Sequence, residues 1–279
     1  MSARVWAMAF ASVVASTFAW AQERVSFPSL DGAANAPLVL VGLWFSASVS
    51  PAPAVVLLHG CGGAFDRRGQ LTPKMRDYAA LFNSAGYHAL VVDSLTPRYE
   101  TELCTQRIGK RRVTQSNRRL DALGAVAYLA ERPDVDATKI GLVGWSNGAS
   151  TVLAATNLRH HDVAVAQTRA AFAVAFYPGC EADLRRGYEP AAPLLMLVGQ
   201  IDDWTPSGPC RALARAAGDP KPEIDTYPGA YHGFDSDTPV RLRKDVPNGA
   251  NPGQGVHVGG NAAAWNASRQ RLLRFLAER

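Results

Sequence analysis

Residues 139–150 read Lys-Ile-Gly-Leu-Val-Gly-Trp-Ser-Asn-Gly-Ala-Ser, and this stretch decides the fold. A short apolar run leads into Gly144-Trp145-Ser146-Asn147-Gly148, a G-x-S-x-G motif followed by a segment compatible with a helix. A serine on a tight turn after a buried strand projects its hydroxyl above the sheet, and glycines on both sides relieve crowding of the backbone. A helix beginning at Asn147 would point its free N–H groups toward developing negative charge.

Strands and helices alternate along the chain around this motif. The opening strands are expected at Arg24 to Phe27 and Leu38 to Phe45, with a turn at Ser29 to Gly32 between them. Further strands are predicted at residues 54–58, 88–92, 171–176, 193–198 and 223–227, and helices at 74–85, 116–131, 148–158, 210–217 and 262–276. This order predicts an α/β fold with a mostly parallel central sheet and helices on both faces. Residues 235–260 lack periodicity and are expected to form an ordered surface loop.

The N-terminus has the features of a secretory signal peptide. Arg4 supplies a positive charge, Val5 to Phe18 is apolar or small, and Ala19-Trp20-Ala21 fits an A-x-A cleavage site. A membrane anchor needs about 20 apolar residues, whereas this run has about 14. We therefore expect residues 1–21 to be removed on export to the periplasm or medium. Residues 22–279 then form a single α/β domain with no membrane span.

The formal charge is +5, and basic residues gather in one segment between positions 107 and 119. They are Arg107, Lys110, Arg111, Arg112, Arg118 and Arg119. Such a cluster could attract nucleic acid, an anionic surface or an acidic substrate. No nucleic-acid motif or interleaved aromatic accompanies it, so we expect no nucleic-acid partner. We interpret the cluster as a solvated loop and helix face with some internal ion pairs, such as Arg119 with Asp121.

Cys61, Cys104, Cys180 and Cys210 are the four cysteines of the chain. Their spacings fit no zinc site, and no metal or organic cofactor is expected. Disulfides are permitted in an exported protein, and four cysteines allow three pairings. Cys104 is a possible partner of Cys61 on a neighbouring loop. Cys180 and Cys210 are a second candidate pair, because they follow strands that we expect to be adjacent.

Three polar residues follow buried strands in the chain order Ser, Asp, His that is seen in α/β-hydrolases. Ser146 ends one strand, the pair Asp202-Asp203 follows the next but one, and His232 follows the last. The carboxyl ends of strands in open α/β sheets carry the ligand site. Ser146 is the predicted nucleophile, His232 its general base and Asp202 the carboxylate that orients the imidazole.

The glycine-rich segment His59-Gly-Cys-Gly-Gly63 follows the strand at residues 54–58. Backbone N–H groups of Cys61, in this loop, and of Asn147, after the nucleophile, are expected to form an oxyanion hole. His59 is expected to be structural, and Asp93 to support the loops nearby.

At these positions the sequence resembles the dienelactone hydrolases. The motifs that carry the resemblance are residues 55–63 and 144–148, Tyr177-Pro-Gly179, Asp202-Asp-Trp-Thr-Pro206 and Tyr231-His-Gly-Phe234. The D-x-x-x-P pattern of the family places the triad acid at Asp202. The best-known members carry cysteine where this chain has Ser146, and an arginine soon after the histidine that is missing here. Arg98, in a loop like that of another family arginine, and Trp204 are the candidate substrate-binding residues.

Together these observations predict an exported serine hydrolase that cleaves a small-molecule carboxylic ester or lactone through a Ser146 acyl-enzyme. Export makes dienelactone itself an unexpected substrate. Two alternatives stay open. One is a peptidase or another acyl-transfer enzyme on the same fold, and the other is a non-catalytic binding protein that kept the fold. The sequence does not predict the oligomeric state.

Overall fold

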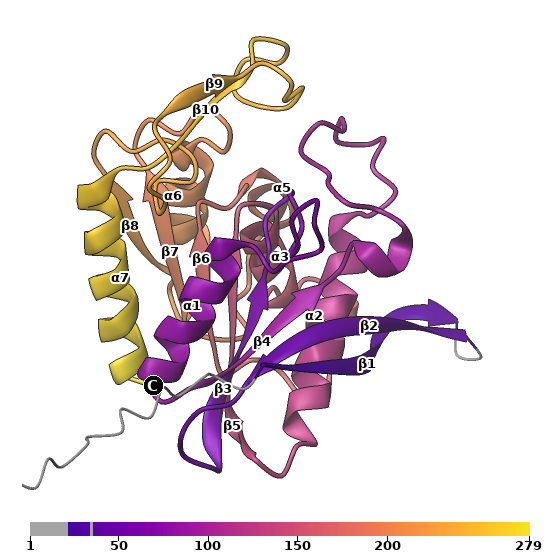
Figure 1. Cartoon of the computed structure of the whole chain (residues 1–279). Coiled ribbons are helices and arrows are strands. Elements are labelled where there is room, and N and C mark those ends of the chain that lie inside the picture. Colours follow the sequence, from indigo (N-terminus) through magenta and orange to yellow (C-terminus); the bar gives the residue numbers. More distant parts are fainter. Residues whose placement is uncertain (1–21, 34–35) are drawn as a thin grey trace, which may run out of the picture.

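An eight-stranded sheet with the order β1-β2-β4-β3-β5-β6-β7-β8 forms the centre of the molecule (Figure 1). It is seen in a computed structural model that describes residues 22–33 and 36–279. The predicted signal peptide, residues 1–21, lies outside the described residues. Strands β1 and β2 are antiparallel to each other, β2 is antiparallel to β4, and all other neighbours in this sheet are parallel.

The strands of the sheet are β1 (Gln22–Ala33), β2 (Ala36–Phe45), β3 (Ala52–Leu58), β4 (His88–Asp93), β5 (Val135–Trp145), β6 (Phe172–Phe176), β7 (Leu194–Gly199) and β8 (Glu223–Tyr227). Strands β4, β6 and β7 are buried along their whole length. Their side chains alternate between two separate apolar cores, so that in β3 Val56 and Leu58 face one core while Val55 and Leu57 face the other. Continuous apolar runs are therefore what a sheet covered on both faces requires.

The helices are α1 (Pro73–Ser84), the 3-10 helix η1 (Thr96–Arg98), α2 (Gln115–Ala130), α3 (Asn147–Ala155), α4 (His161–Ala164), α5 (Glu181–Arg186), α6 (Ser207–Ala216) and α7 (Ala262–Ala277). Buried residues of α1 and α7 belong to one core, and those of α2, α3 and α6 belong to the other. Figure 1 shows α1 and α7 on the same face of the sheet. The predicted layers, with helices on both faces, are confirmed.

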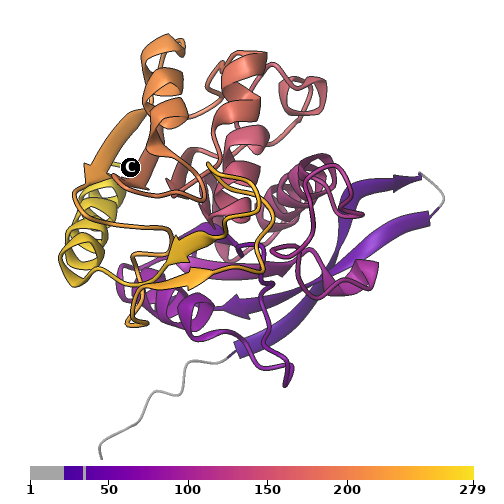
Figure 2. The same cartoon turned by 90° about the horizontal axis from the view of Figure 1, so that it is seen from above.

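Two predicted loops differ in the structure. Strand β1 continues through the turn expected at Ser29 to Gly32 and absorbs it as a register irregularity between Pro28 and Gly32. Residues 235–260 contain a short antiparallel hairpin, β9 (Arg241–Arg243) and β10 (Val256–Val258). Strands of three residues are too short to show periodicity in a sequence. Seen from above, this hairpin lies over the end of the sheet (Figure 2). No helix in the described part of the chain is long and apolar enough to cross a membrane.

Candidate active site

Ser146 lies on a sharp turn between β5 and α3 and has a backbone φ of 54°. A non-glycine residue in this left-handed region is strained and persists only where its surroundings hold it. The two glycines of the motif make the turn possible. A Cβ on Gly144 would collide with the carbonyl of Gly148, and a Cβ on Gly148 would collide with the carbonyl of Leu58 at the end of β3. The helix therefore starts directly against the neighbouring strand, which leaves the Ser146 hydroxyl above the sheet.

His232 reaches Ser146 from the loop that follows β8. Its Nε2 lies 2.8 Å from Ser146 Oγ, and its Nδ1 lies 2.8 Å from Asp202 Oδ2. The Asp202 carboxylate is held in turn by the backbone N–H groups of Trp204 and Thr205, which donate to Oδ1 at 2.8 and 2.9 Å. Asp202 and His232 are both buried, at 5% and 4% exposure, and Ser146 is half-buried. An imidazole placed in this way can take the hydroxyl proton while the carboxylate stabilises the resulting cation.

The neighbouring Asp203 has a different partner. It accepts hydrogen bonds from the backbone N–H of His257 at 2.8 Å and pairs with Nδ1 of the same residue at 2.7 Å. His257 lies in β10, so Asp203 ties the β9–β10 hairpin to the loop after β7. The two adjacent acids therefore serve two different histidines, and the one that faces His232 is Asp202.

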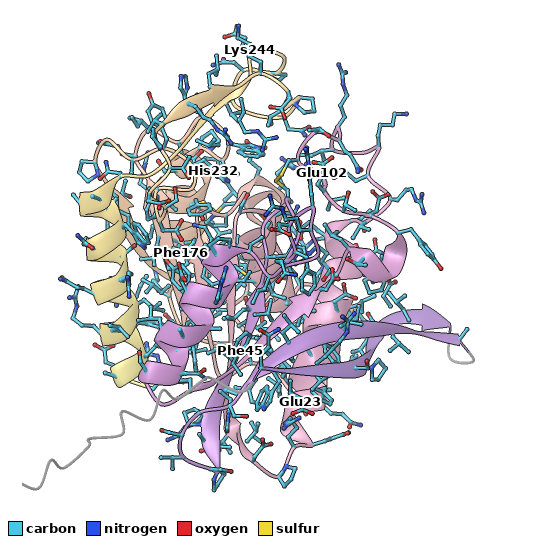
Figure 3. The ribbon with its side chains drawn as sticks, in the orientation of Figure 1. Glu23, Phe45, Glu102, Phe176, His232 and Lys244 are labelled. Atoms are coloured by element: carbon cyan, nitrogen blue, oxygen red, sulfur yellow. A yellow bond between two sulfur atoms is a disulfide. The ribbon has the colours of Figure 1, made fainter. Side chains whose placement is uncertain are left out.

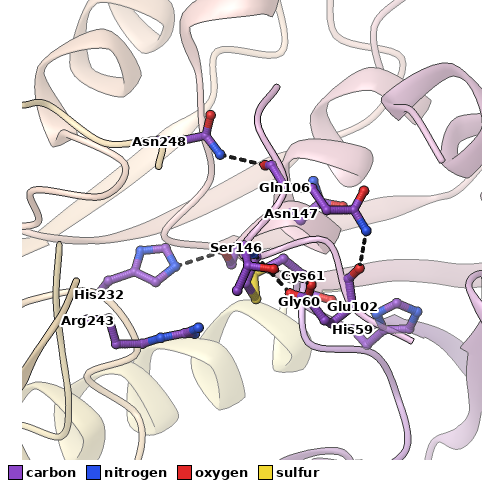
Figure 4. The surroundings of a disulfide bond; sticks show 12 residues. His59, Gly60, Cys61, Glu102, Gln106, Ser146, Asn147, His232, Arg243 and Asn248 are labelled. Carbon is purple, nitrogen blue, oxygen red and sulfur yellow. Dashed lines mark hydrogen bonds between the residues drawn. A yellow bond between two sulfur atoms is a disulfide. The ribbon is translucent and has the colours of Figure 1, made fainter. Parts of the chain in front are cut away.

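Cys61, Ser146 and Asn147 line the same pocket, and Figure 4 shows them close together. Gly60 packs so closely that a Cβ there would stand 3.6 Å from the Ser146 Cβ. Within residues 22–33 and 36–279, neither the Cys61 nor the Asn147 N–H donates a hydrogen bond to another protein group. Two free N–H groups beside a serine hydroxyl can together donate hydrogen bonds to the oxyanion of a tetrahedral intermediate.

A pocket of about 630 Å³ opens beside Ser146. Its walls come from the loop before α2, from α3, from α5 and from the segment after β7, and Asn248 of the segment 235–260 also lines it. The Asn248 side chain accepts from the Ile108 N–H at 3.0 Å and donates to the Gln106 carbonyl at 2.8 Å. The segment 235–260 and the loop before α2 are thus joined beside the pocket. Figure 3 shows His232 and Glu102 at this same end of the sheet.

The two candidate substrate-binding residues have different positions. Trp204 lines the pocket, and its ring centroid lies 4.6 Å from that of His232. Arg98 lies away from the pocket and donates to both carboxylate oxygens of Asp121, at 2.8 and 2.9 Å, and to Asp31 at 2.7 Å. Its guanidinium is therefore already neutralised within the fold, and the structure does not bring it to the substrate space.

The four cysteines form two disulfides, Cys61–Cys104 and Cys180–Cys210. The first ties the glycine-rich loop to the long loop after β4, and the Cys61 carbonyl also accepts the Leu103 N–H at 2.7 Å. The second joins the start of α5 to α6. Among the described residues, no three His, Cys, Asp or Glu side chains gather as a metal site would require.

The basic segment is only in part the solvated face that the sequence indicated, because Arg107, Lys110 and Arg112 are exposed and the other three basic residues are not. Arg118 is fully buried, and Arg111 is partly buried and lines the pocket. Arg119 pairs with Asp162 at 2.8 Å rather than with Asp121, which is held by Arg98. Helical spacing could have indicated this, because Arg118 shares one face of α2 with the buried Ala122, Ala125 and Leu129.

His59 and Asp93 have the supporting roles that were predicted. His59 is fully buried, and burial lowers the pKa of its imidazole well below 6.5 with the neighbouring Arg118 charge adding to the effect. Asp93 accepts the N–H groups of Leu95 and Thr96 at 3.0 and 3.1 Å and so shapes the loop after β4.

Comparison with known proteins identifies solved structures with a similar fold. No curated protein sequence matches. Among solved structures, a dienelactone hydrolase from Anabaena variabilis superposes with a TM-score of 0.63 at 17% identity, over 93% of this chain and 98% of that one. A dienelactone hydrolase-like promiscuous phosphotriesterase from metagenomic libraries gives a TM-score of 0.62 at 18% identity, over 92% and 98%.

An esterase of Thermogutta terrifontis with bound propionate gives a TM-score of 0.60 at 18% identity, over 93% of this chain and 94% of that one. At such identities these structures share the fold. The sequence model of the dienelactone hydrolase family matches residues 41–279. The chain therefore belongs to the dienelactone hydrolase family, and it is a hydrolase of ester type.

Proposed function

We propose that this protein is a serine hydrolase that cleaves a small carboxylic ester or lactone through an acyl-enzyme on Ser146. The observation that carries the proposal is the chain of two 2.8 Å contacts from Ser146 Oγ through the His232 ring to Asp202. A serine hydroxyl is a poor nucleophile until a base accepts its proton, and this geometry supplies that base together with the carboxylate that orients it.

In the proposed reaction, Ser146 Oγ attacks the substrate carbonyl while its proton passes to His232 Nε2. The carbonyl oxygen becomes an oxyanion and accepts hydrogen bonds from the Cys61 and Asn147 N–H groups. Collapse of this intermediate breaks the bond to the alcohol oxygen, which takes the proton from His232. Water then attacks the acyl-enzyme by the same route, with His232 as base, and releases the acid and free Ser146.

The pocket favours a small substrate. Its volume of about 630 Å³ is in the range of small-molecule sites, and its lining mixes apolar and polar side chains. The similar structures include an esterase with bound propionate and a promiscuous phosphotriesterase, which supports ester chemistry at such a site. A screen of short acyl esters, lactones and peptides is the direct way to rank the substrate classes.

We also propose that the chain is exported. The support is the charged, apolar and A-x-A pattern of residues 1–21 and the pairing of all four cysteines in disulfides, which form in oxidising compartments. In a bacterial host, cell fractionation followed by intact-mass measurement should find a periplasmic or secreted chain that begins at Gln22. A full-length chain confined to the cytoplasm contradicts export and leaves the hydrolase proposal unaffected.

Labelling with a fluorophosphonate tests the catalytic proposal. The wild type should be labelled once, on Ser146, and Ser146→Ala should take up no label although it folds. The same variant should lose ester hydrolysis by about 10⁵- to 10⁶-fold, as in other serine enzymes whose nucleophile is removed. Folded wild-type protein that resists the label and cleaves none of the screened substrates contradicts the proposal and favours a binding protein.

A further inference from the structure

Arg118 lies completely buried beneath the turn that carries Ser146. Its Nη1 donates to Asn147 Oδ1 at 2.5 Å, and its Nη2 donates to the His59 carbonyl at 2.8 Å. These acceptors belong to the two segments that carry the free N–H groups beside the nucleophile. Asn147 itself carries one of these N–H groups. Cys61 carries the other, and His59 precedes it by two residues in the glycine-rich loop.

The charge of Arg118 has no carboxylate as a hydrogen-bond partner. Both of its acceptors are neutral, and within the described residues its Nε–H finds no partner. Asp121 is already held by Arg98 and by the Ser29 hydroxyl. Burial lowers the pKa of Arg118 to about 10, so the side chain stays charged at neutral pH. Burial of a cation costs desolvation free energy unless other interactions offset it.

We propose that Arg118 is a positioning residue of the oxyanion hole. Its planar fork holds the start of α3 and the glycine-rich loop at a fixed separation, so that the Asn147 and Cys61 N–H groups converge on one point. Its positive charge stands behind both donors and favours negative charge at that point. This inference rests on the proposed serine-hydrolase function, since an oxyanion hole is meaningful only where an acyl group is transferred.

The test uses the mature protein and two measurements from one fluorophosphonate reaction. The end point of labelling counts the folded sites, and the rate constant of labelling reports how well each site stabilises the developing oxyanion. Arg118→Met keeps most of the side-chain volume but removes the fork and the charge. We expect its rate constant, and kcat for an activated ester, to fall about 100-fold, as for loss of one oxyanion donor. KM should change less than threefold, and labelling should still reach one per chain.

Arg118→Lys tests the same inference without removing the charge. It keeps a cation but cannot bridge both acceptors, so we expect a loss of about tenfold. It also decides the question if Arg118→Met fails to fold. Arg132→Met is the matched control, because Arg132 pairs with Asp134 and covers the Trp44 ring far from the nucleophile turn. This control should be less stable than the wild type but have the same rate constant per titrated site.

Asn147→Ala distinguishes action through this side chain from a general effect on packing. If Arg118 acts partly through the Asn147 amide, Asn147→Ala alone should slow labelling, and Arg118→Met with Asn147→Ala should be no slower than Arg118→Met. Folded Arg118 variants with wild-type rate constants, or a double variant whose losses simply multiply, overturn the inference. A wild type that takes up no label overturns the proposed function itself, which is a different result from slow labelling in the variants alone.

Discussion

Two buried charges flank the turn that carries Ser146, and their hydrogen-bond partners differ in number and kind. Asp235, three residues after His232 and only 3% exposed, accepts hydrogen bonds from four donors. They are the Lys74 ammonium, the Tyr78 hydroxyl at 2.9 Å, the Trp145 indole N–H at 2.9 Å and the Tyr177 hydroxyl at 2.7 Å. Arg118, on the other side, has two neutral acceptors and an Nε–H without a partner in the described chain.

We interpret the Asp235 contacts as structural and the Arg118 charge as one that acts on the reaction at Ser146. The Asp235 carboxylate is saturated, and burial together with its charge raises the pKa of both Tyr78 and Tyr177 well above 10, so the phenols remain donors. The cluster joins α1, the residue before Ser146 and the loop that carries His232. The carboxylates of Asp121 and Asp93 lie near Arg118, but neither is hydrogen-bonded to it, and we expect its charge to act on a transition state beside it. We expect changes at Asp235 to affect stability and changes at Arg118 to affect rate.

Apart from Ser146→Ala, Asp202→Asn should have the largest effect, because Asp202 contacts Nδ1 of His232 directly. The amide keeps the shape of the side chain but holds His232 in the wrong tautomer, so kcat should fall about ten-thousandfold. Steady-state kinetics on an activated ester measures this, and thermal unfolding shows that the fold persists. Asp203→Asn is the control, since Asp203 contacts His257. A greater loss of kcat in the control would assign the triad acid to Asp203.

Asp235→Ala tests the structural role of the hydrogen bonds to the Asp235 carboxylate. It leaves the half-buried Lys74 ammonium without its carboxylate partner and three buried donors without their acceptor, which should lower the free energy of unfolding by about 3–5 kcal/mol. Urea denaturation measures this loss. Among molecules that remain folded, the rate constant for fluorophosphonate labelling should stay within about tenfold of the wild type, well above that of Arg118→Met. A stable Asp235→Ala protein that is labelled slowly would show that Asp235 affects rate rather than stability, which contradicts the expected role of this charge.

The two disulfides differ in position, because Cys61–Cys104 includes a residue whose N–H is a proposed oxyanion donor. Removing either pair, as Cys61→Ser with Cys104→Ser or as Cys180→Ser with Cys210→Ser, should cost about 2–4 kcal/mol of unfolding free energy. The sequence separations of 43 and 30 residues predict similar losses. Labelling per folded site should slow more in the Cys61 variant, whose loop carries a proposed donor. An equal or greater slowing in the Cys180 variant contradicts this view of the glycine-rich loop.

The smallest expected effect is a pH dependence of the free energy of unfolding. It is caused by His59, whose carbonyl accepts a hydrogen bond from Arg118. Because burial keeps its folded pKa well below 6.5, the unfolded chain binds the proton first as the pH falls. Its contribution to stability is therefore complete above pH 6.5 and is lost below it, by about 1.4 kcal/mol per pH unit until the folded pKa is reached. Urea unfolding between pH 7 and pH 5 measures this slope. His59→Gln, which does not titrate, should show a shallower slope, and an unchanged slope contradicts the assignment.

The sequence predicts the part of the molecule that repeats a simple pattern. Continuous apolar runs indicate strands buried on both faces, and polar residues that follow them indicate where the strands end. That reasoning found Ser146, Asp202 and His232, which the structure brings within hydrogen-bond distance. It also found both disulfide pairs as candidates, with Cys180–Cys210 the more definite, because loops after neighbouring strands lie close together.

The remaining features depend on contacts that leave no local pattern. Arg118 meets a backbone carbonyl 59 residues away and an amide 29 residues away, and it stands in a basic segment that resembles a solvated surface. Asp235 draws its donors from three distant elements. Arg98 satisfied a family pattern loosely, yet Asp31 and Asp121 hold it within the fold. In each case, the role of a buried charge depends on its partners, and only the folded chain brings those partners together.

Trapping the acyl-enzyme tests most directly whether Ser146 is the nucleophile. Mature protein mixed with a short activated ester and quenched in acid within milliseconds should gain the mass of one acyl group. Peptide mapping should place that group on Ser146, with a burst of released alcohol equal to the number of sites. In Asp202→Asn, where deacylation should be slow, peptide mapping should find the acyl group on Ser146 as well. Turnover by Ser146→Ala at the wild-type rate, or an acyl group on a different side chain, would contradict the central claim.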